Sequence, residues 1–442
     1  MTRQIIFLIT IIITLSCFTF TVNRFVSFFR LTRPGFPVRD LGTRFRVMLT
    51  VAFGQTKIFR RPVIGFFHAL VFWGFCVVLF GSAEMIYDGL TGQEKSFDAL
   101  GRVYDFMMAS GDVFGLLVLI AILIFLARRI FFHIGRFEGI EMNRATHIDA
   151  NIALSIILLL MVSLIGMNIS YIMIKTGSGE NYPGVYPVSA WISGWMPQWS
   201  SSTAQASFEA FWWTHILLIF LFANILPYSK HFHVFMSVPN VFLTRLEPLG
   251  KLTNMDSITR EVRMMLYPDQ EVLETDGPEQ VPGRFGVRDI EDVTWKNYFD
   301  SLSCTQCGRC TSVCPANLTG KKLSPRKVIM DIRSRMKEKG PRMVKSGKDY
   351  SDHRSLLRDY ISEEELWACT LCNACAQECP ININHPTVIV DMRRYLVMEE
   401  ASAPGELKTV FSNIENNGAP WQFSPEDRLL WAKELFIREK KN

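Results

Sequence analysis

The chain has 442 residues, of which 49% are hydrophobic and 12% aromatic, and its formal net charge is only +5. This length suits two or three domains, and a small charge with its basic residues in short loops argues against nucleic acid as a partner. Apolar residues concentrate before about residue 227 and charged residues after it. The sequence therefore predicts a membrane half followed by a soluble half.

Five apolar stretches of the first half are each close to the roughly 20 residues that a membrane-spanning helix needs. The first is followed, not preceded, by basic residues and lacks a small-residue cleavage site, so we expect a retained helix and not a signal peptide. Together the stretches predict a bundle of five transmembrane helices. They are Ile5–Val22, Val63–Ala83, Phe106–Ala127, Ile152–Ile174 and Phe208–Pro227.

The loops between these stretches predict the orientation. The loop after the second stretch is acidic and the loop before the fifth is rich in Trp, whereas the other two loops are basic. By the positive-inside rule, basic loops face the cytoplasm. We therefore expect a multi-pass protein of the inner, cytoplasmic membrane, with the N-terminus outside and the C-terminal domain in the cytoplasm. The basic residues are Arg24, Arg30, Arg33, Arg39, Arg44, Arg46, Lys57, Arg60 and Arg61 in one loop and Arg128, Arg129, Arg136 and Arg144 in the other.

Histidines in the apolar half raise a functional question, because ionisable groups are costly inside a membrane. His68 falls near the inner start of the second stretch and His233 at the inner end of the fifth, which places them at the same depth on different helices. His215 precedes His233 by eighteen residues, which is five whole turns of an α-helix. These two share a face unless Pro227 kinks the helix, and His231 points roughly the other way.

Neutral imidazoles that face each other across a helix bundle are suitable ligands for a six-coordinate haem iron. We interpret His68 and His233 as the ligands of one haem b, against the plainer interpretation that they bond to backbone or to lipid headgroups. His215 has no histidine partner, because Val78 stands ten residues after His68. For His215, a quinone-binding role, a second haem and a structural role stay open.

Eight of the ten cysteines fall in two runs of the soluble half, CTQCGRCTSVCP from Cys304 and CTLCNACAQECP from Cys369. Both have the spacing C-x2-C-x2-C-x3-C-P, in which three thiolates bind one [4Fe–4S] cluster and the fourth binds the other. Zinc usually takes cysteine pairs separated by a longer gap, so we favour two clusters. The predicted ligands are Cys304, Cys307, Cys310 and Cys379 for one cluster and Cys369, Cys372, Cys375 and Cys314 for the other.

The segments around the cysteine runs have helical patterns. Ser324 with Pro325 is a typical helix start and Gly340 a typical helix stop, and His385 is expected to begin a helix after the second run. We therefore expect an all-α protein, in which a five-helix transmembrane bundle precedes an α-helical two-cluster ferredoxin domain. The sequence carries no G-x-G-x-x-G motif, P-loop or Cys-Cys pair, so nothing in it has a known nucleotide or flavin signature.

These observations predict four regions. Residues 1–235 form a transmembrane cytochrome b-type domain, and residues 236–292 form a linker with one short helix near Ser257–Leu266. Residues 293–400 form the two-cluster domain. Residues 401–442 form a tail in which Ser424 opens an amphipathic helix that packs on its own domain or docks on a partner.

The residues quoted above resemble the membrane-anchored heterodisulfide-reductase-like iron–sulfur oxidoreductases. The first part is similar to the gamma subunit of respiratory nitrate reductase, a five-helix cytochrome b with two haems. His215 and His233 match the paired histidines of its fifth helix and His68 the first histidine of its second helix, while Val78 departs from the pattern. The C-terminal part is similar to the helical two-cluster [4Fe–4S] subunit of heterodisulfide reductase, through both cysteine runs and the segment NNGAPWQFSPEDRLLWA.

The resemblance implies one haem b at the inner side and leaves the outer haem in doubt. In fused relatives, a cysteine-rich domain with Cys-Cys-Gly motifs follows this tail. The resemblance therefore implies a separate cytoplasmic partner, either a cysteine-rich or a flavoprotein oxidoreductase subunit, docked near Trp421 to Phe436.

We expect an electron-transfer subunit of a quinone-linked oxidoreductase complex, which passes electrons between the quinone pool and that partner through haem b and two [4Fe–4S] clusters. His215 is the candidate quinone site on the outer side, and Lys230 with His231 marks the rival site on the inner side. The alternative is a non-catalytic membrane anchor whose clusters sense redox state.

Overall fold

The computed structural model describes residues 2–268 and 284–432. Over these residues it is helical and contains isolated bridges but no β-strand, so the predicted all-α class is confirmed. The described residues divide into two compact units, Met1–Thr253 with Asp289–Val388, and Asn254–Arg288 with Ile389–Asn442. The predicted boundaries between the four regions stay predictions.

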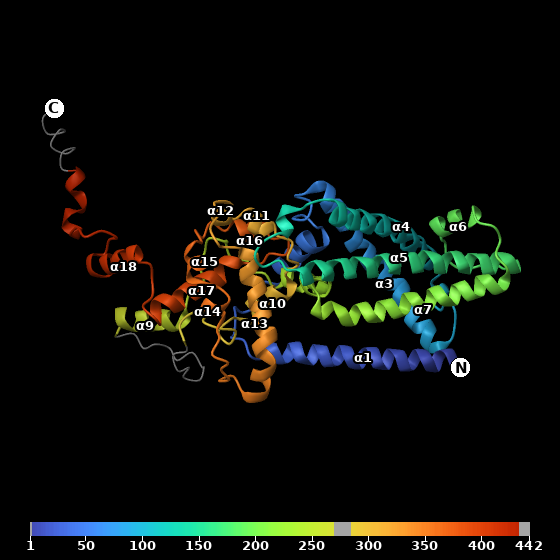
Figure 1. Ribbon diagram of the computed structural model, residues 1–442, viewed down its shortest axis with the longest axis horizontal. Coiled ribbons are helices and arrows are strands. Elements are labelled where there is room, and N and C mark those ends of the chain that lie inside the picture. The colour runs from blue at the N-terminus through green and yellow to red at the C-terminus, as the bar shows by residue number, and fades with distance from the viewer. Residues whose placement is uncertain (1, 269–283, 433–442) are drawn as a thin grey trace, which may run out of the picture. The chain divides into compact units, whose positions relative to one another are not determined.

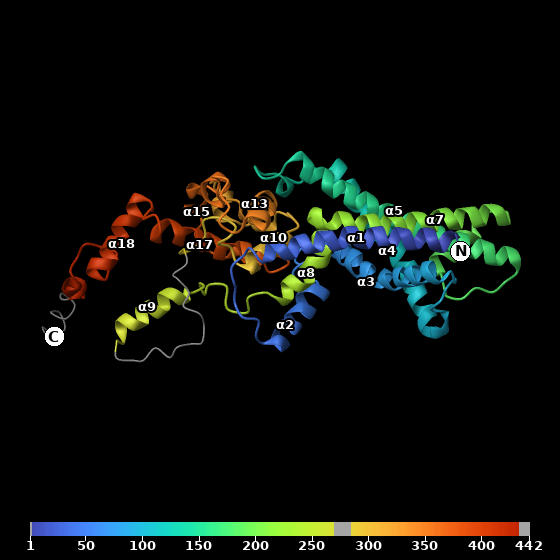
Figure 2. The same cartoon turned by 90° about the horizontal axis from the view of Figure 1, so that it is seen from below.

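Five long helices of the first unit lie side by side (Figures 1 and 2). Among the described residues these five are long and apolar enough to cross a membrane, as the sequence predicts. Their ends follow local signals, since Pro62 begins the second helix, the Asn143 side chain caps the fourth and Ser200 caps the fifth. They are α1 (Thr2–Phe29), α3 (Pro62–Thr91), α4 (Arg102–Phe131), α5 (Arg144–Ser178) and α7 (Ser201–Ile225).

The fifth membrane helix ends earlier than the histidine spacing requires. Helix α7 stops at Ile225, a 3-10 turn follows at Leu226–Tyr228, and α8 (His233–Phe242) begins only after a second turn. Pro227 explains the break, because proline has no N–H to continue the helical ladder. The expectation that His215 and His233 share the face of one continuous helix is therefore wrong.

The cysteine runs sit among short helices at one end of the five-helix bundle, which we call the cysteine end (Figure 1). Helix α13 starts after Ser324 as predicted, but it continues through Gly340 to Ser346. Gly340 packs against the ring of Phe28 on α1, where an added Cβ would lie 3.0 Å from the ring, so this glycine serves a close approach and not a helix stop. The helices are α10 (Trp295–Ser303), α11 (Arg309–Ser312), α12 (Pro315–Leu318), α13 (Pro325–Ser346), α14 (Leu356–Asp359), α15 (Glu363–Trp367), α16 (Ala374–Glu378) and α17 (His385–Met398).

Shorter elements complete the described chain. In the first unit, α2 (Leu41–Val47) runs into a π-helix over Met48–Phe53, and α6 (Pro187–Gly194) precedes α7. In the second unit, α9 (Asp256–Leu266) confirms the predicted linker helix, and α18 (Gly405–Asn417) lies in the tail. The predicted C-terminal amphipathic helix opens as a 3-10 turn over Pro425–Leu429, and its remainder from residue 433 lies outside the described residues.

A buried ion-pair network holds α13 in the first unit. Arg335 is fully buried and donates to Asp289 at 2.8 Å and to Asp352 at 2.7 Å, and Lys339 also donates to Asp289 at 2.8 Å. Because every charge in the network has an opposite partner, its burial is compensated. The network joins α13 to the segment that precedes α10.

We predict that Arg335→Ala lowers the free energy of unfolding by about 3 kcal/mol, because it leaves buried carboxylates short of a partner. The measurement is denaturant unfolding followed by circular dichroism. Arg354→Ala is the matched control: Arg354 pairs with Glu338 on the surface, where a pair is worth less than about 1 kcal/mol. Equal losses in the two variants would show that burial of the network does not matter.

Candidate cofactor-binding site

A cavity of about 510 Å³ opens inside the helix bundle of the first unit. Its volume falls in the range of roughly 300–1,000 Å³ that is typical of small-molecule and cofactor sites. Most of its lining is aliphatic or aromatic, and the polar exceptions include four histidines. They are His68, His215, His231 and His233.

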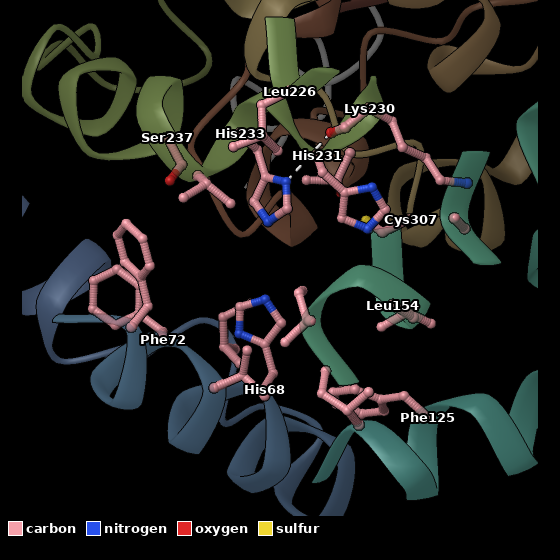
Figure 3. A pocket seen from close by; sticks show the side chains of 18 of the residues that line it. His68, Phe72, Phe125, Leu154, Leu226, Lys230, His231, His233, Ser237 and Cys307 are labelled. Atoms are coloured by element: carbon pink, nitrogen blue, oxygen red, sulfur yellow. Dashed lines mark hydrogen bonds between the residues drawn. The ribbon is translucent and has the colours of Figure 1, made fainter. Parts of the chain in front are cut away.

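His68 of α3 and His233 of α8 point toward one another across the cavity (Figure 3), and they are close enough to interact electrostatically. The Nδ1 of His233 contacts the backbone carbonyl of Lys230 at 3.3 Å. The Nδ1 of His68 contacts Oε1 of the Gln55 side chain at 3.2 Å. Since both contacts are acceptors, each Nδ1 carries the proton. Each Nε2 lone pair is then left for a ligand in the cavity, as in histidines that bind metals.

Burial keeps the His233 imidazole neutral, and a hydrogen bond fixes the Gln55 amide that faces His68. Burial lowers the pKa of His233 to about 4, so its imidazole is neutral at physiological pH. The Gln55 amide nitrogen donates to the Ala52 carbonyl, which fixes the amide so that its oxygen faces His68. His231 also lines the cavity, so the expectation that it points the other way from His233 is wrong.

His215 of α7 lines the same cavity, farther from the cysteine end, together with Val78 of α3. It is buried, and its Nδ1 lies 3.0 Å from the Leu160 carbonyl and 2.9 Å from the Ser163 hydroxyl. The carbonyl is an acceptor, so Nδ1 donates and Nε2 is the atom available to a ligand. Val78 offers no lone pair across from it, as the sequence indicates.

The cavity is basic at the cysteine end. The basic side chains in its lining are Arg128, Arg129, Arg136, Lys230 and Arg309, and within the described chain no Asp or Glu lines it. Burial, followed by the charge of Arg61, lowers the pKa of Arg136 to about 10, so Arg136 stays charged at neutral pH. Its Nε and Nη1 are buried without a hydrogen-bond partner.

These residues fit a haem b. Two neutral imidazoles with free Nε2 atoms face each other across a mostly apolar cavity, so His68 and His233 would be the residues that hold the iron of such a group. The unpartnered Arg136 suits a carboxylate, because a buried cation needs an opposite charge. When bound, such a haem would supply a one-electron carrier inside the bundle.

The eight cysteines of the two runs form two groups in space. Burial, together with the neighbouring thiols of Cys307 and Cys304, raises the pKa of Cys379 to about 12. The pKa of Cys310 is raised by burial and by Cys307, Cys304 and Cys379. The fourth cysteine of the second run therefore lies among the first three of the first run.

The second group shows the reciprocal arrangement. Burial raises the pKa of Cys375 to about 12, with further contributions from Cys369, Cys314 and Cys372. This grouping agrees with an exchange of fourth cysteines, and the assignment of each cysteine to a cluster stays a prediction. The described residues hold no group of three His, Cys, Asp or Glu side chains that could hold a single metal ion, and a [4Fe–4S] cluster binds each thiolate to a different iron.

The two groups differ in their surroundings, and we name them accordingly. The first, the proximal set, contains Cys307, which lines the histidine cavity together with its neighbours Thr305, Gln306 and Arg309 (Figure 3). The second, the distal set, contains Cys372, which is exposed to solvent. The proximal set is Cys304, Cys307, Cys310 and Cys379, and the distal set is Cys369, Cys372, Cys375 and Cys314.

The loops at the cysteine end of the bundle hold the proximal set against the cavity. Lys57 donates to the Cys379 carbonyl at 3.2 Å, and Arg309 donates back to the Lys57 carbonyl at 2.9 Å. On the other side, Arg326 forms a buried ion pair with Glu141 at 2.7 Å and donates to the Arg136 carbonyl at 2.7 Å. Both loops are thus bonded to the cysteine region.

Sequence reasoning missed several of these residues. Gln55 and the Leu160 carbonyl orient histidines that lie far away in the chain, and no local pattern marks them. The sequence marks Arg136 and Lys57 only as topology signals, although both contact the site. A count of basic residues in the loops cannot show that some of them also contact the site, because that requires the position of the cavity.

Comparison with known proteins supports the interpretation of the cysteine region as an iron–sulfur domain. Residues 303–383 match the family model described as 4Fe-4S dicluster domain. The chain is 28% identical over 465 residues to the probable iron-sulfur-binding oxidoreductase FadF of Bacillus subtilis, which covers 98% of this chain and 61% of that protein. The chain is related to iron–sulfur oxidoreductases.

Two further relatives extend this finding. The chain is 31% identical over 420 residues to the EtfAB:quinone oxidoreductase of Syntrophomonas wolfei, which covers 88% of this chain and 54% of that protein. It is 37% identical over 163 residues to the probable membrane-anchored ferredoxin of Chromohalobacter salexigens, which covers 34% and 24%. Shorter matches include heterodisulfide reductase subunits of two Methanosarcina species.

The extent of the matches limits which properties of the relatives can be assigned to this chain. The chain spans 61% and 54% of the lengths of the first two relatives, so the activities of those whole proteins remain proposals for this chain. No solved structure matches. The predicted likeness to heterodisulfide-reductase-like iron–sulfur oxidoreductases is confirmed, as is the 4Fe-4S dicluster domain.

We predict that His68→Ala and His233→Ala each abolish haem binding while the iron and acid-labile sulfide of the cysteine region stay unchanged. The reason is that each variant removes one of the two facing Nε2 atoms. The measurement is the pyridine haemochrome of the purified protein beside total iron. His133→Ala is the control, because His133 is exposed; unchanged haem in either cavity variant would refute the pairing.

We also predict that Cys379→Ser damages the cluster of the proximal set and spares the other, although Cys379 belongs to the second run. Electron paramagnetic resonance of the reduced protein would show the loss of one cluster signal. Cys76→Ser, a change at an exposed cysteine of α3, should leave both signals. If Cys379→Ser and Cys375→Ser removed the same signal, the exchange of fourth cysteines would be wrong.

Proposed function

We propose that this protein is the membrane-bound electron-transfer subunit of a quinone-linked oxidoreductase complex. It would pass electrons between the quinone pool and a cytoplasmic partner through haem b at His68 and His233 and through two [4Fe–4S] clusters. One observation carries the proposal: the cavity that both histidines enter is also lined by Cys307 of the proximal set.

The surroundings of the two cysteine sets support an order of the clusters. The proximal set adjoins the cavity, so its cluster would exchange electrons with the haem. The distal set includes the exposed Cys372, so its cluster would exchange electrons with the partner. The Cys310 thiol interacts electrostatically with the thiols of both Cys379 and Cys375, which supports neighbouring sets, as a relay requires.

His215 is the residue that we propose for the quinone. It lines the part of the cavity farther from the cysteine end, its Nδ1 is bonded to α5, and its Nε2 can bond to a quinone oxygen or accept a proton from a quinol. The rival site is formed by Lys230, which donates to the Thr146 carbonyl at 2.8 Å, and by His231, whose Nδ1 bonds to Ser229.

The partner and the membrane sidedness are proposals of the same kind. A relative named EtfAB:quinone oxidoreductase supports a quinone at one end and a flavoprotein at the other, and the heterodisulfide reductase matches support a cysteine-rich partner instead. The basic loops bonded to the cysteine region support a cytoplasmic location of that region, because basic loops tend to stay on the cytoplasmic side. The membrane would then be the inner, cytoplasmic membrane.

An anchor that only tethers or senses would not carry electrons, and this difference can be measured. We predict that a quinol added anaerobically to the purified full-length chain reduces both the haem and the clusters. Visible absorption would follow the haem and electron paramagnetic resonance the clusters. A protein whose centres are reduced by dithionite but not by any quinol would be an anchor.

His215→Ala provides the matched test of the quinone site. We expect it to keep the native haem content and the dithionite-reducible clusters, and to slow reduction by quinol at least tenfold. A loss of haem in this variant would instead mean that His215 is a haem ligand. An unchanged quinol rate would move the quinone elsewhere.

A further inference from the structure

The guanidinium of Arg136 lines the cavity and has buried donors without an acceptor. Arg129 donates to Asn151 at 3.0 Å, Lys230 to Thr146 at 2.8 Å and Arg309 to Lys57 at 2.9 Å. Arg136 is different, because its Nε and Nη1 are buried and make no hydrogen bond. Two such donors on one charged group carry a desolvation cost of several kcal/mol unless a ligand is present to accept from them.

The backbone of Arg136 is held firmly, so the position of its side chain is not incidental. Arg326 donates to the Arg136 carbonyl at 2.7 Å and to the Glu138 carbonyl at 2.6 Å. Gly308 of the first cysteine run has φ of 73°, and a Cβ there would collide with the same Arg136 carbonyl. The turn that carries Arg136 is therefore pressed between the cysteine run and the cavity.

The chemistry of the missing acceptor follows from the lining. The cavity holds basic and neutral side chains, and among the described residues none of its lining side chains is acidic. A buried guanidinium with free N–H groups suits a carboxylate, because a charge-assisted hydrogen bond from either Nε or Nη1 would satisfy a donor and offset the charge. A haem b carries two propionate carboxylates on one edge, and they need such partners when buried.

Arg136 also reaches toward the cysteine region. Its charge interacts with the Cys307 sulfur of the proximal set, as does the charge of Arg309. One guanidinium thus lies between the cavity and the nearest cluster ligand. A fixed positive charge near two electron carriers stabilises the reduced form of each, because each gains negative charge on reduction.

We propose that Arg136 binds a propionate carboxylate of the haem held by His68 and His233, and that the same guanidinium stabilises the reduced states of both this haem and the proximal cluster. Arg136 is then a positioning residue that sets two reduction potentials together. This inference rests on the proposed haem, so its test begins with protein in which haem has been measured.

The test compares three variants of the full chain. Arg136→Gln removes the charge, whereas Arg136→Lys keeps the charge but replaces the planar guanidinium by an ammonium. Arg144→Gln removes an equal charge from an exposed position at the start of α5. The readouts are the propionate bending bands in the resonance Raman spectrum and the midpoint potentials of the haem and clusters in a redox titration.

We expect Arg136→Gln to keep the His68/His233 haem, shift the propionate bands and lower the midpoint potentials of the haem and of one cluster. Arg136→Lys should shift the bands but keep the potentials close to native, and Arg144→Gln should change neither. If Arg136→Gln assembles without haem, the propionate bands of Arg136→Lys test the proposal on their own.

Native propionate bands and potentials in Arg136→Gln, or native bands in Arg136→Lys, would overturn the proposal and would point to another anion, such as a lipid phosphate, on this guanidinium. A native protein without haem would instead refute the proposed function from which the inference starts. The two failures are distinguished by the haem content of the unmodified chain.

Discussion

The candidate site depends on the bonds between the bundle and the first cysteine run. The buried pair of Arg326 with Glu141, at 2.7 Å, ties α13 to the loop between α4 and α5. Lys57 ties the loop before α3 to the Cys379 carbonyl. Because a buried ion pair is strongly destabilised when one partner moves away, these contacts fix the proximal cysteine set at the edge of the histidine cavity.

This constraint gives the basic loops two roles. A loop rich in arginine and lysine sets the topology of a membrane protein through its charge alone. Here the same loops also supply the carbonyls and cations that hold the cysteine region, and they supply Arg136 to the cavity. A charge count cannot separate these roles, because only the tertiary contacts show which cation is bonded and which lies in the cavity.

Local patterns predicted the parts of the fold that local physics controls. Apolar stretches of about 20 residues gave five long helices, and the Ser324–Pro325 start of α13 was found from capping chemistry. The predicted stop at Gly340 failed, because a glycine also allows a close approach, here to Phe28 of α1. The same limit applies to Pro227, whose break in the fifth helix depends on how the chain turns toward α8.

The residues of the candidate site also divide into those that a local sequence pattern marks and those that only tertiary contacts reveal. The C-x2-C-x2-C-x3-C-P spacing predicts which cysteines share a cluster, because the exchange of fourth ligands is built into the repeat, and this assignment stays a prediction. His68 and His233 are paired by their depth in the membrane half, and their role as haem ligands also stays a prediction. The Gln55 and Leu160 contacts that orient the histidines, and the free donors of Arg136, follow no local sequence pattern and could not be inferred without the cavity.

The most direct measurement is the rate at which oxidised haem is reduced after the clusters have been photoreduced, followed in the visible absorption of the haem. Electron transfer is fast over a short distance and slow over a long one. We expect Cys375→Ser to keep rapid haem reduction and Cys379→Ser to slow it at least tenfold, because only the second variant loses the cluster of the proximal set. Equal rates in the two variants would contradict the contact between the histidine cavity and the proximal cysteine set.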